Sequence, residues 1–227
     1  MNELIPAFRE SVLRPMNSTL IDIAEVGIDS VLSEGLFQEV PILKTLLSAK
    51  NVYLNIRDRN FLKQTLVFIQ SVNNHSLTDE QLQKHRRKLE ENPKWAEKEL
   101  GRVMVLLDRM IEENKARMLA AFYAAYVKQE ITWDVFCDLS DVVDRMFLGD
   151  VAVLYVIEST QIKYETASHV GDRLIAVGLV ANPSRTIKPG DKIRPESALP
   201  LTLTELGRKF CHYCKQNMLN SNSPELV

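Results

Sequence analysis

The sequence has little glycine, little cysteine and no long apolar run, and each shortage argues against a class of protein. Its 227 residues include 8 glycines and 3 cysteines. It contains no glycine-rich phosphate loop, no G-x-S-x-G nucleophile turn and no H-E-x-x-H zinc motif, which disfavours nucleotide-binding proteins and hydrolases. It also lacks an apolar run of about 18 residues and a basic-then-apolar N-terminus. We therefore expect a cytoplasmic, soluble protein without a membrane span.

The three cysteines are Cys137, Cys211 and Cys214. They fit a reducing compartment, because a core of this size needs no disulfides. Cys211 and Cys214 have the C-x-x-C spacing of a redox pair or of half a zinc site. A structural zinc would need two more ligands, and no recognisable spacing supplies them from Cys137, His169 or His212. We expect apolar thiols packed under the last helix, and we predict no metal and no cofactor.

The composition that remains suits a packed helical core. The chain is 45% hydrophobic and 26% charged, and its formal net charge of -2 gives no general attraction to nucleic acid or to an anionic membrane. Apolar residues recur every three or four positions over residues 56–70, which predicts a helix from about Arg57. Arg57, Asp58 and Arg59 precede its apolar face, so at least one should lie at the edge of the core with a partner.

We expect an all-helical domain over residues 18–148, with an N-terminal arm over residues 1–17. Pro6 and Pro15 and the weak periodicity of the arm indicate a segment laid on the surface or a loose end. Ser18 is a predicted N-cap for a first helix. Pro41 is well placed to open a second helix.

Two helical hairpins of related design are predicted within this domain. Thr78 and Gln81 have the spacing of a capping box, and Thr132 offers a second cap of the same kind. Each follows an apolar helix of similar length, at residues 61–72 and 116–127. Between them Asn92 and Pro93 should start a long helix, whose expected apolar face contains Trp95, Leu100, Val103, Met104, Leu107 and Ile111.

An Asp-Arg dipeptide recurs along the chain. Adjacent residues on a helix point about 100° apart, so we expect ion pairs between helices rather than one shared site. Metal binding or acid-base catalysis is less favoured, because no histidine or second carboxylate lies at the spacing that di-metal bundles use. We predict no catalytic residue. The residues expected in structural ion pairs are Arg57, Asp58, Arg59, Asp108, Arg109, Asp144 and Arg145.

A basic run at residues 84–88 lies inside the helix that Thr78 opens. Glu80, Glu90 and Glu91 flank the run, and consecutive charges spread around a helix. We therefore expect a solvated face rather than a nucleic-acid site.

The C-terminal part, residues 149–219, changes character. Helices are predicted at 151–157 and 166–177, and two short strands should flank a loop rich in proline and charge at 182–200. Thr204 should cap a last helix. This is the order of a winged helix. The expected fold class is therefore mainly α, with a multi-helix N-terminal domain, a small winged-helix-like α+β domain and a C-terminal tail over residues 220–227.

Two short segments of this C-terminal part carry a family resemblance. They are the Gly-Leu-Val turn at 178–180 and the Leu-Thr-x-x-Gly-x-x-Phe helix at 203–210. The first is preceded by a leucine at the spacing found in many bacterial winged-helix proteins. Together they resemble the end of the uncharacterised bacterial proteins grouped with abortive-infection protein alpha. The helical part is similar to bacterial and prophage open reading frames of unassigned role. The resemblance implies antiviral defense, and it names no activity.

We therefore expect a non-enzymatic binding protein, a phage-conflict component that acts through protein or ligand interaction, with a protein partner or a second copy of itself. The alternative is a winged-helix transcriptional regulator that binds DNA. Residues 172–215 hold 8 basic and 4 acidic side chains, which favours weak phosphate contact. A metal or redox enzyme ranks third. The expected DNA contacts are Arg173, Arg185, Lys188, Lys192, Arg194, Arg208 and Lys209.

Overall fold

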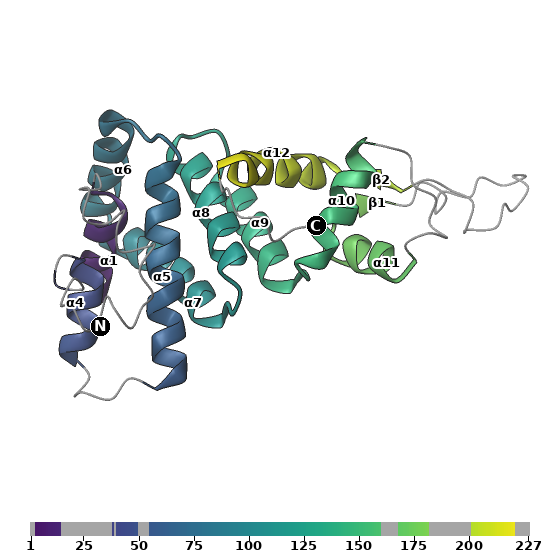
Figure 1. Cartoon of the computed structure of the whole chain (residues 1–227). Helices are drawn as coiled ribbons and strands as arrows, with labels where there is room; N and C mark the ends of the chain where they lie inside the picture. Colours follow the sequence, from purple (N-terminus) through teal and green to yellow (C-terminus); the bar gives the residue numbers. More distant parts are fainter. Residues whose placement is uncertain are drawn as a thin grey trace, which may run out of the picture. The chain divides into compact units, whose positions relative to one another are not determined.

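The computed structural model describes residues 3–14, 38, 40–49, 55–159, 168–181 and 201–220. Within these ranges most residues are helical and two short strands are present, so the prediction of a mainly α fold is confirmed (Figure 1). The chain divides into two compact units, Met1–Trp133 and Asp134–Val227. The helices of the first unit are α1 (Leu4–Val12), α4 (Pro41–Ala49), α5 (Ile56–Asn74), α6 (Asp79–Glu91), α7 (Pro93–Arg109) and α8 (Glu113–Val127).

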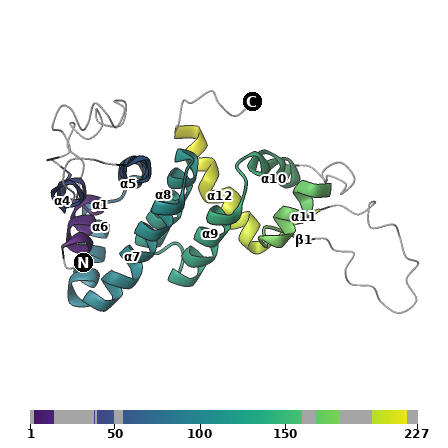
Figure 2. The same cartoon turned by 90° about the horizontal axis from the view of Figure 1, so that it is seen from below.

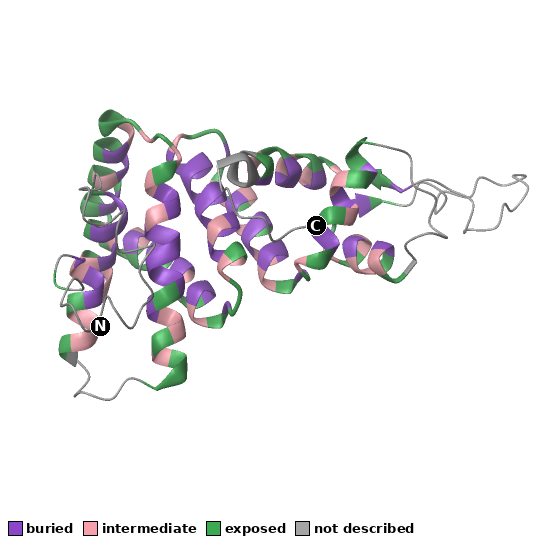
Figure 3. Ribbon diagram, viewed as in Figure 1, coloured by how far each residue is buried: buried purple, intermediate pink, exposed green. Residues whose placement is uncertain are grey.

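The core of the first unit is built around α5 and α8, which pack side by side (Figures 1 and 2). The predicted apolar face of α5 is buried, with Leu62, Phe68 and Ile69 almost inaccessible to solvent. On α8 every residue from Met118 to Val127 is buried (Figure 3). Four of those residues are alanines, whose small side chains let neighbouring helices approach closely. Polar groups carried on α8 are therefore held inside the unit.

The caps predicted for two of these helices are present in the structure. Thr78 and Gln81 form the predicted capping box at the start of α6, each bonding to the backbone N–H of the other. Asn92 accepts a hydrogen bond from the N–H of Trp95, and Pro93 occupies the first turn of α7. These caps satisfy backbone N–H groups that have no partner inside the helix. They fix where α6 and α7 begin.

The expected N-terminal arm is instead a packed helix. In α1 the side chains of Phe8 and Val12 are fully buried, and the Phe8 ring stacks on Phe68 with centroids 6.1 Å apart. The Ser11 hydroxyl accepts a hydrogen bond from the N–H of Ile42, which ties α1 to α4. Pro6 does not break α1, because it lies in the first turn, where a missing N–H costs nothing. The helix expected from Ser18 lies outside the described residues.

One residue of the long helix was wrongly assigned to the buried face. Ile111 is 79% exposed. The helix α7 ends at Arg109, and Met110 takes an extended conformation, with φ -78° and ψ 139°. The helical spacing therefore stops before Ile111, which no longer shares a face with Leu107.

The second unit contains the strand pair. The strands β1 (Val180–Ala181) and β2 (Thr202–Leu203) are antiparallel, with Val180 opposite Leu203. The Thr204 hydroxyl accepts a hydrogen bond from the N–H of Gly207, as expected of a cap. The helices of this unit are α9 (Trp133–Arg145), α10 (Gly149–Ser159), α11 (Ser168–Ala176) and α12 (Glu205–Asn220).

From the sequence we predicted a domain boundary between residues 148 and 149. In the structure the first compact unit ends at Trp133 and the second begins at Asp134. Nearly all of α9 thus belongs to the second unit. None of the helices in the described ranges combines the length and the apolar character needed to cross a bilayer.

Candidate binding cleft and its buried carboxylate

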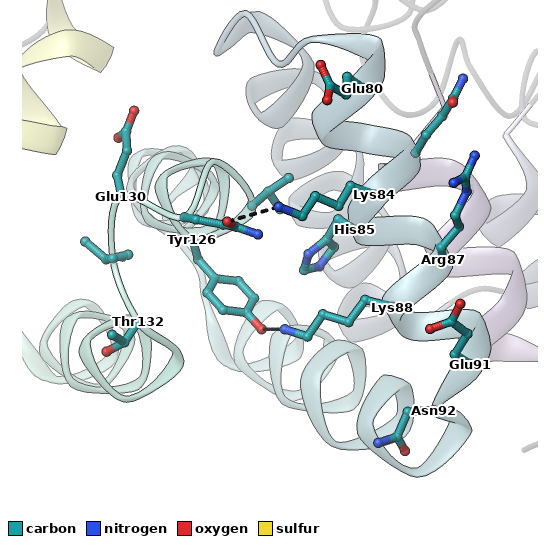
Figure 4. Close-up of a pocket in the computed structure, with 14 residues that line it drawn as sticks. Glu80, Lys84, His85, Arg87, Lys88, Glu91, Asn92, Tyr126, Glu130 and Thr132 are labelled. Carbon is teal, nitrogen blue, oxygen red and sulfur yellow. Dashed lines mark hydrogen bonds between the residues drawn. The ribbon is translucent and has the colours of Figure 1, made fainter.

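The first unit has an open cleft of about 960 Å³ between α6 and the chain that leaves α8 (Figure 4). Its α6 wall carries charges of both signs, and its other wall is formed by the end of α8 and residues 129–132. The phenol ring of Tyr126 and the lysines of α6 face one another across it (Figure 4). Its charged and aromatic lining includes Glu80, Lys84, His85, Arg87, Lys88, Glu91, Tyr126 and Glu130.

A buried carboxylate lies beneath this cleft. Glu99 of α7 is fully buried, and its Oε1 atom accepts hydrogen bonds from His85 Nε2 at 2.6 Å and from the Tyr123 hydroxyl at 2.9 Å. Its Oε2 atom accepts from Trp95 Nε1 and from the Tyr126 hydroxyl, both at 2.8 Å. Four donors therefore occupy the four acceptor positions of the carboxylate. We call these five side chains the Glu99 network.

The network favours the ionised form of Glu99. Burial is the largest single influence and raises the pKa of Glu99, but the hydrogen bond and charge of His85, together with the two tyrosine hydroxyls, lower that pKa below its ordinary value. Burial and the Glu99 charge raise the pKa of Tyr123 well above its ordinary value. Tyr123 thus stays a neutral donor.

Helical spacing brings the network together. His85 shares the buried face of α6 with Leu82 and Leu89. Trp95 and Glu99 are four residues apart on α7, and Tyr123 and Tyr126 are three apart on α8, so each pair lies on one face. Three helices thereby converge on a single carboxylate.

Two lysines of the basic run bridge the cleft. Lys88 Nζ donates to the Tyr126 hydroxyl at 2.7 Å, and Lys84 Nζ donates to Gln129 Oε1 at 3.3 Å. The prediction of a solvated face holds for Lys84, Arg87 and Lys88, which are exposed. It is wrong for His85, which is 6% exposed.

The sequence interpretation missed Glu99 altogether. The sequence does contain a signal for it. Glu99 lies at helical spacing between Ala96 and Val103, on a face of α7 whose other buried residues are apolar. A carboxylate inside such a stripe needs donors.

One of the predicted ion pairs joins two helices of the first unit. Arg57 of α5 pairs with Asp108 of α7, and Arg57 Nε donates to Asp108 Oδ1 at 3.1 Å. The Arg57 side chain is 74% exposed, so this pair lies on the surface. In the second unit Arg145 lines a small pocket with Asp138 and Asp141. Interactions also involve Asp58, Arg59, Arg109 and Asp144.

The described members of the predicted DNA-contact set are engaged within the second unit. Arg173 Nε and Nη2 donate to the two oxygens of Asp150 at 2.8 and 2.5 Å. Arg208 donates to the Leu203 carbonyl at 2.9 Å, and Lys209 pairs with Glu205 at 2.7 Å. The four basic residues predicted for the wing, Arg185, Lys188, Lys192 and Arg194, lie outside the described residues.

Both cysteines of the C-x-x-C pair are buried free thiols. Burial raises the pKa of Cys211 to about 12 and that of Cys214 well above its ordinary value. Thiols in this state are poor nucleophiles and poor metal ligands. Across the described ranges no three His, Cys, Asp or Glu side chains group as a metal site would require.

The fold and the site define a mainly helical protein with a charged cleft over a buried carboxylate. No protein-family model matches this chain, and no curated protein or solved structure matches it either.

Proposed function

We propose that the protein acts by binding a partner in the cleft of its first unit, rather than by catalysing a reaction. The observation that carries this proposal is the saturated Glu99 carboxylate. A general base needs an acceptor lone pair directed at the substrate, whereas all four acceptor positions of Glu99 are taken. The network instead fixes the wall of the cleft, which suits a preformed recognition surface.

The charges around the cleft support a polar partner. Lys84, Arg87 and Lys88 line it together with Glu80, Glu91 and Glu130. A surface with both signs of charge is complementary to a segment that also carries both signs. A protein segment has this chemistry. The proposed setting, phage conflict in a bacterial or prophage context, rests on the resemblance of the C-terminal segment to abortive-infection proteins.

A plating assay tests the proposal. Cells that express the chain are challenged with a phage panel, and plating efficiency is compared for the wild type, Lys84→Glu and Glu130→Lys. We expect the wild type to lower plating of at least one phage and both cleft variants to lose that protection. Glu97→Lys is the matched control, because Glu97 is exposed on α7 outside the cleft. Full protection by both cleft variants would contradict the proposal.

A second candidate is DNA binding by the C-terminal part. Its support is the order α10, α11, β1, β2 and α12, with the two strands paired as in a winged helix. Titration of a labelled random duplex at about 50 and 200 mM salt distinguishes this candidate, since phosphate contacts weaken steeply with salt. Salt-sensitive binding that Arg185→Glu and Lys188→Glu abolish would support it. Absence of binding at the lower salt would eliminate it.

A further inference from the structure

Three aromatic rings meet beneath the cleft, and of the three Tyr126 lines it. The Trp133 ring lies 5.5 Å from Trp95 and 5.4 Å from Tyr126, centroid to centroid, at interplanar angles of 65° and 59°. Lys88 Nζ lies 5.3 Å from the centroid of the Trp95 ring and 4.9 Å from that of Tyr126. We call these three rings the aromatic box. The Lys88 ammonium group lies over two of its rings, Trp95 and Tyr126, and Lys98 Nζ lies 4.9 Å from the centroid of the Trp95 ring.

The Glu99 network strengthens the box as a cation site. The Trp95 N–H and the Tyr126 hydroxyl both donate to Glu99 Oε2. Donation to a carboxylate shifts electron density toward the ring, and the carboxylate itself supplies a negative potential behind the two rings. A cation over these faces is therefore held more firmly than over isolated rings.

Lys88 is placed to leave the box. Its side chain is exposed and lines the cleft, as does Tyr126. Transfer of the Lys88 ammonium group to water breaks its hydrogen bond to the Tyr126 hydroxyl, and the strong hydration of the freed ammonium offsets this loss. A quaternary ammonium group is weakly hydrated and needs no hydrogen-bond acceptor, so aromatic faces bind it preferentially. Glu91 and Glu130 line the same cleft, together with the cations Lys84 and Arg87.

We propose that the aromatic box recognises a quaternary ammonium group and that Lys88 is its exchangeable resident. This inference rests on the proposed function, because it names the ligand chemistry of the same cleft. The group would enter from the cleft as Lys88 swings into solvent. Lys88 thus acts as an internal competitor that sets the affinity for the incoming cation.

The chain offers a direct reporter. It contains two tryptophans, Trp95 and Trp133, and both belong to the box. Intrinsic tryptophan fluorescence is titrated with tetramethylammonium chloride against sodium chloride at equal ionic strength. We expect a saturable change for the wild type and about tenfold tighter binding for Lys88→Met, which lacks the cation shared by Trp95 and Tyr126 but keeps Lys98 over Trp95. Lys84→Met should bind as the wild type does, because Lys84 bonds to Gln129 outside the box.

A flat titration of Lys88→Met, with circular dichroism unchanged from the wild type, would overturn the proposal. Equal tightening by Lys84→Met would overturn it too, because the effect would then be general electrostatics. Lys88→Ala serves as a second variant if Lys88→Met misfolds. Titration with choline and with Nε-trimethyllysine distinguishes a small molecule from a protein side chain as the source. Loss of phage protection tests the proposed function separately, since it does not depend on tetramethylammonium.

Discussion

His85 Nε2 lies 2.6 Å from Glu99 Oε1, and the two side chains are 6% and 0% exposed. This contact joins α6 to α7 inside the first unit, while Tyr123 and Tyr126 bring α8 to the same carboxylate. A buried charge of this kind is tolerated only when its acceptor positions are filled. The positions of His85 and Tyr126 in the cleft therefore depend on their hydrogen bonds to Glu99.

The first prediction concerns the Glu99 charge. Glu99→Gln keeps the size of the side chain but replaces one acceptor oxygen by a donor, which faces donors already in place. We expect the free energy of unfolding of the first unit to fall by about 2–4 kcal/mol. Urea titration followed by tryptophan fluorescence measures this, because Trp95 and Trp133 both lie in that unit. Glu97→Gln, at an exposed site on the same helix, should change stability little. Equal stability of both variants would contradict the account.

The second prediction concerns pH. The pKa of Glu99 is lower in the folded chain than its ordinary value, although burial alone would raise it, because His85 and the tyrosines favour the charge. Stability from this group is present above the unfolded pKa and is lost as pH falls through the folded pKa. The difference in unfolding free energy between wild type and Glu99→Gln should therefore stay constant above the ordinary glutamate pKa and shrink as the pH falls below it. A difference independent of pH would show that Glu99 is not ionised in the fold.

The helices were predictable where capping chemistry is local. Thr78 with Gln81, and Asn92 with Pro93, define the starts of α6 and α7 within four residues of sequence. The α1 helix was missed because its evidence is tertiary: Phe8 is buried by Phe68, sixty residues away in the chain. Local pattern alone could not outweigh the two nearby prolines.

The site was harder to predict than the fold. The basic run at 84–88 was noticed, but burial of His85 depends on three helices meeting at Glu99. The aromatic box likewise joins residues from three helices, and nothing in the spacing of Trp95, Tyr126 and Trp133 along the chain indicates that contact.

The third prediction concerns Arg173. Asp150 is 3% exposed and accepts both donors of the Arg173 fork, which ties α11 to α10. We expect Arg173→Ala to speed hydrogen exchange of backbone amides in α10 and α11, because it leaves a buried carboxylate without its cation. Lys209→Ala, which removes an exposed pair within α12, is the control. If the backbone amides of α10 and α11 exchange at the wild-type rate in Arg173→Ala, Arg173 does not stabilise these helices.

The fourth prediction concerns Gly207. A Cβ atom added there would lie 2.0 Å from the Leu179 carbonyl oxygen, which is backbone and cannot turn aside. That oxygen also accepts the N–H of Thr204 at 3.0 Å, so the start of α12 is fixed against the end of the preceding turn. We expect Gly207→Ala to destabilise the second unit by about 1–3 kcal/mol. Gly149→Ala is the matched control in the same unit, since nothing lies within 4 Å of its added Cβ. Thermal unfolding followed by circular dichroism compares them, and equal midpoints would contradict the close packing.

The claim that the cleft is the binding surface is tested most directly by site-specific photocrosslinking in cells. A photoreactive amino acid is placed at Gln83, which is exposed and lines the cleft, or at Glu97, which is exposed on α7 outside it. We expect a discrete crosslinked product from position 83, weakened by Glu130→Lys, and none from position 97. Identical products from the two positions, or a product from position 83 that Glu130→Lys leaves unchanged, would contradict it.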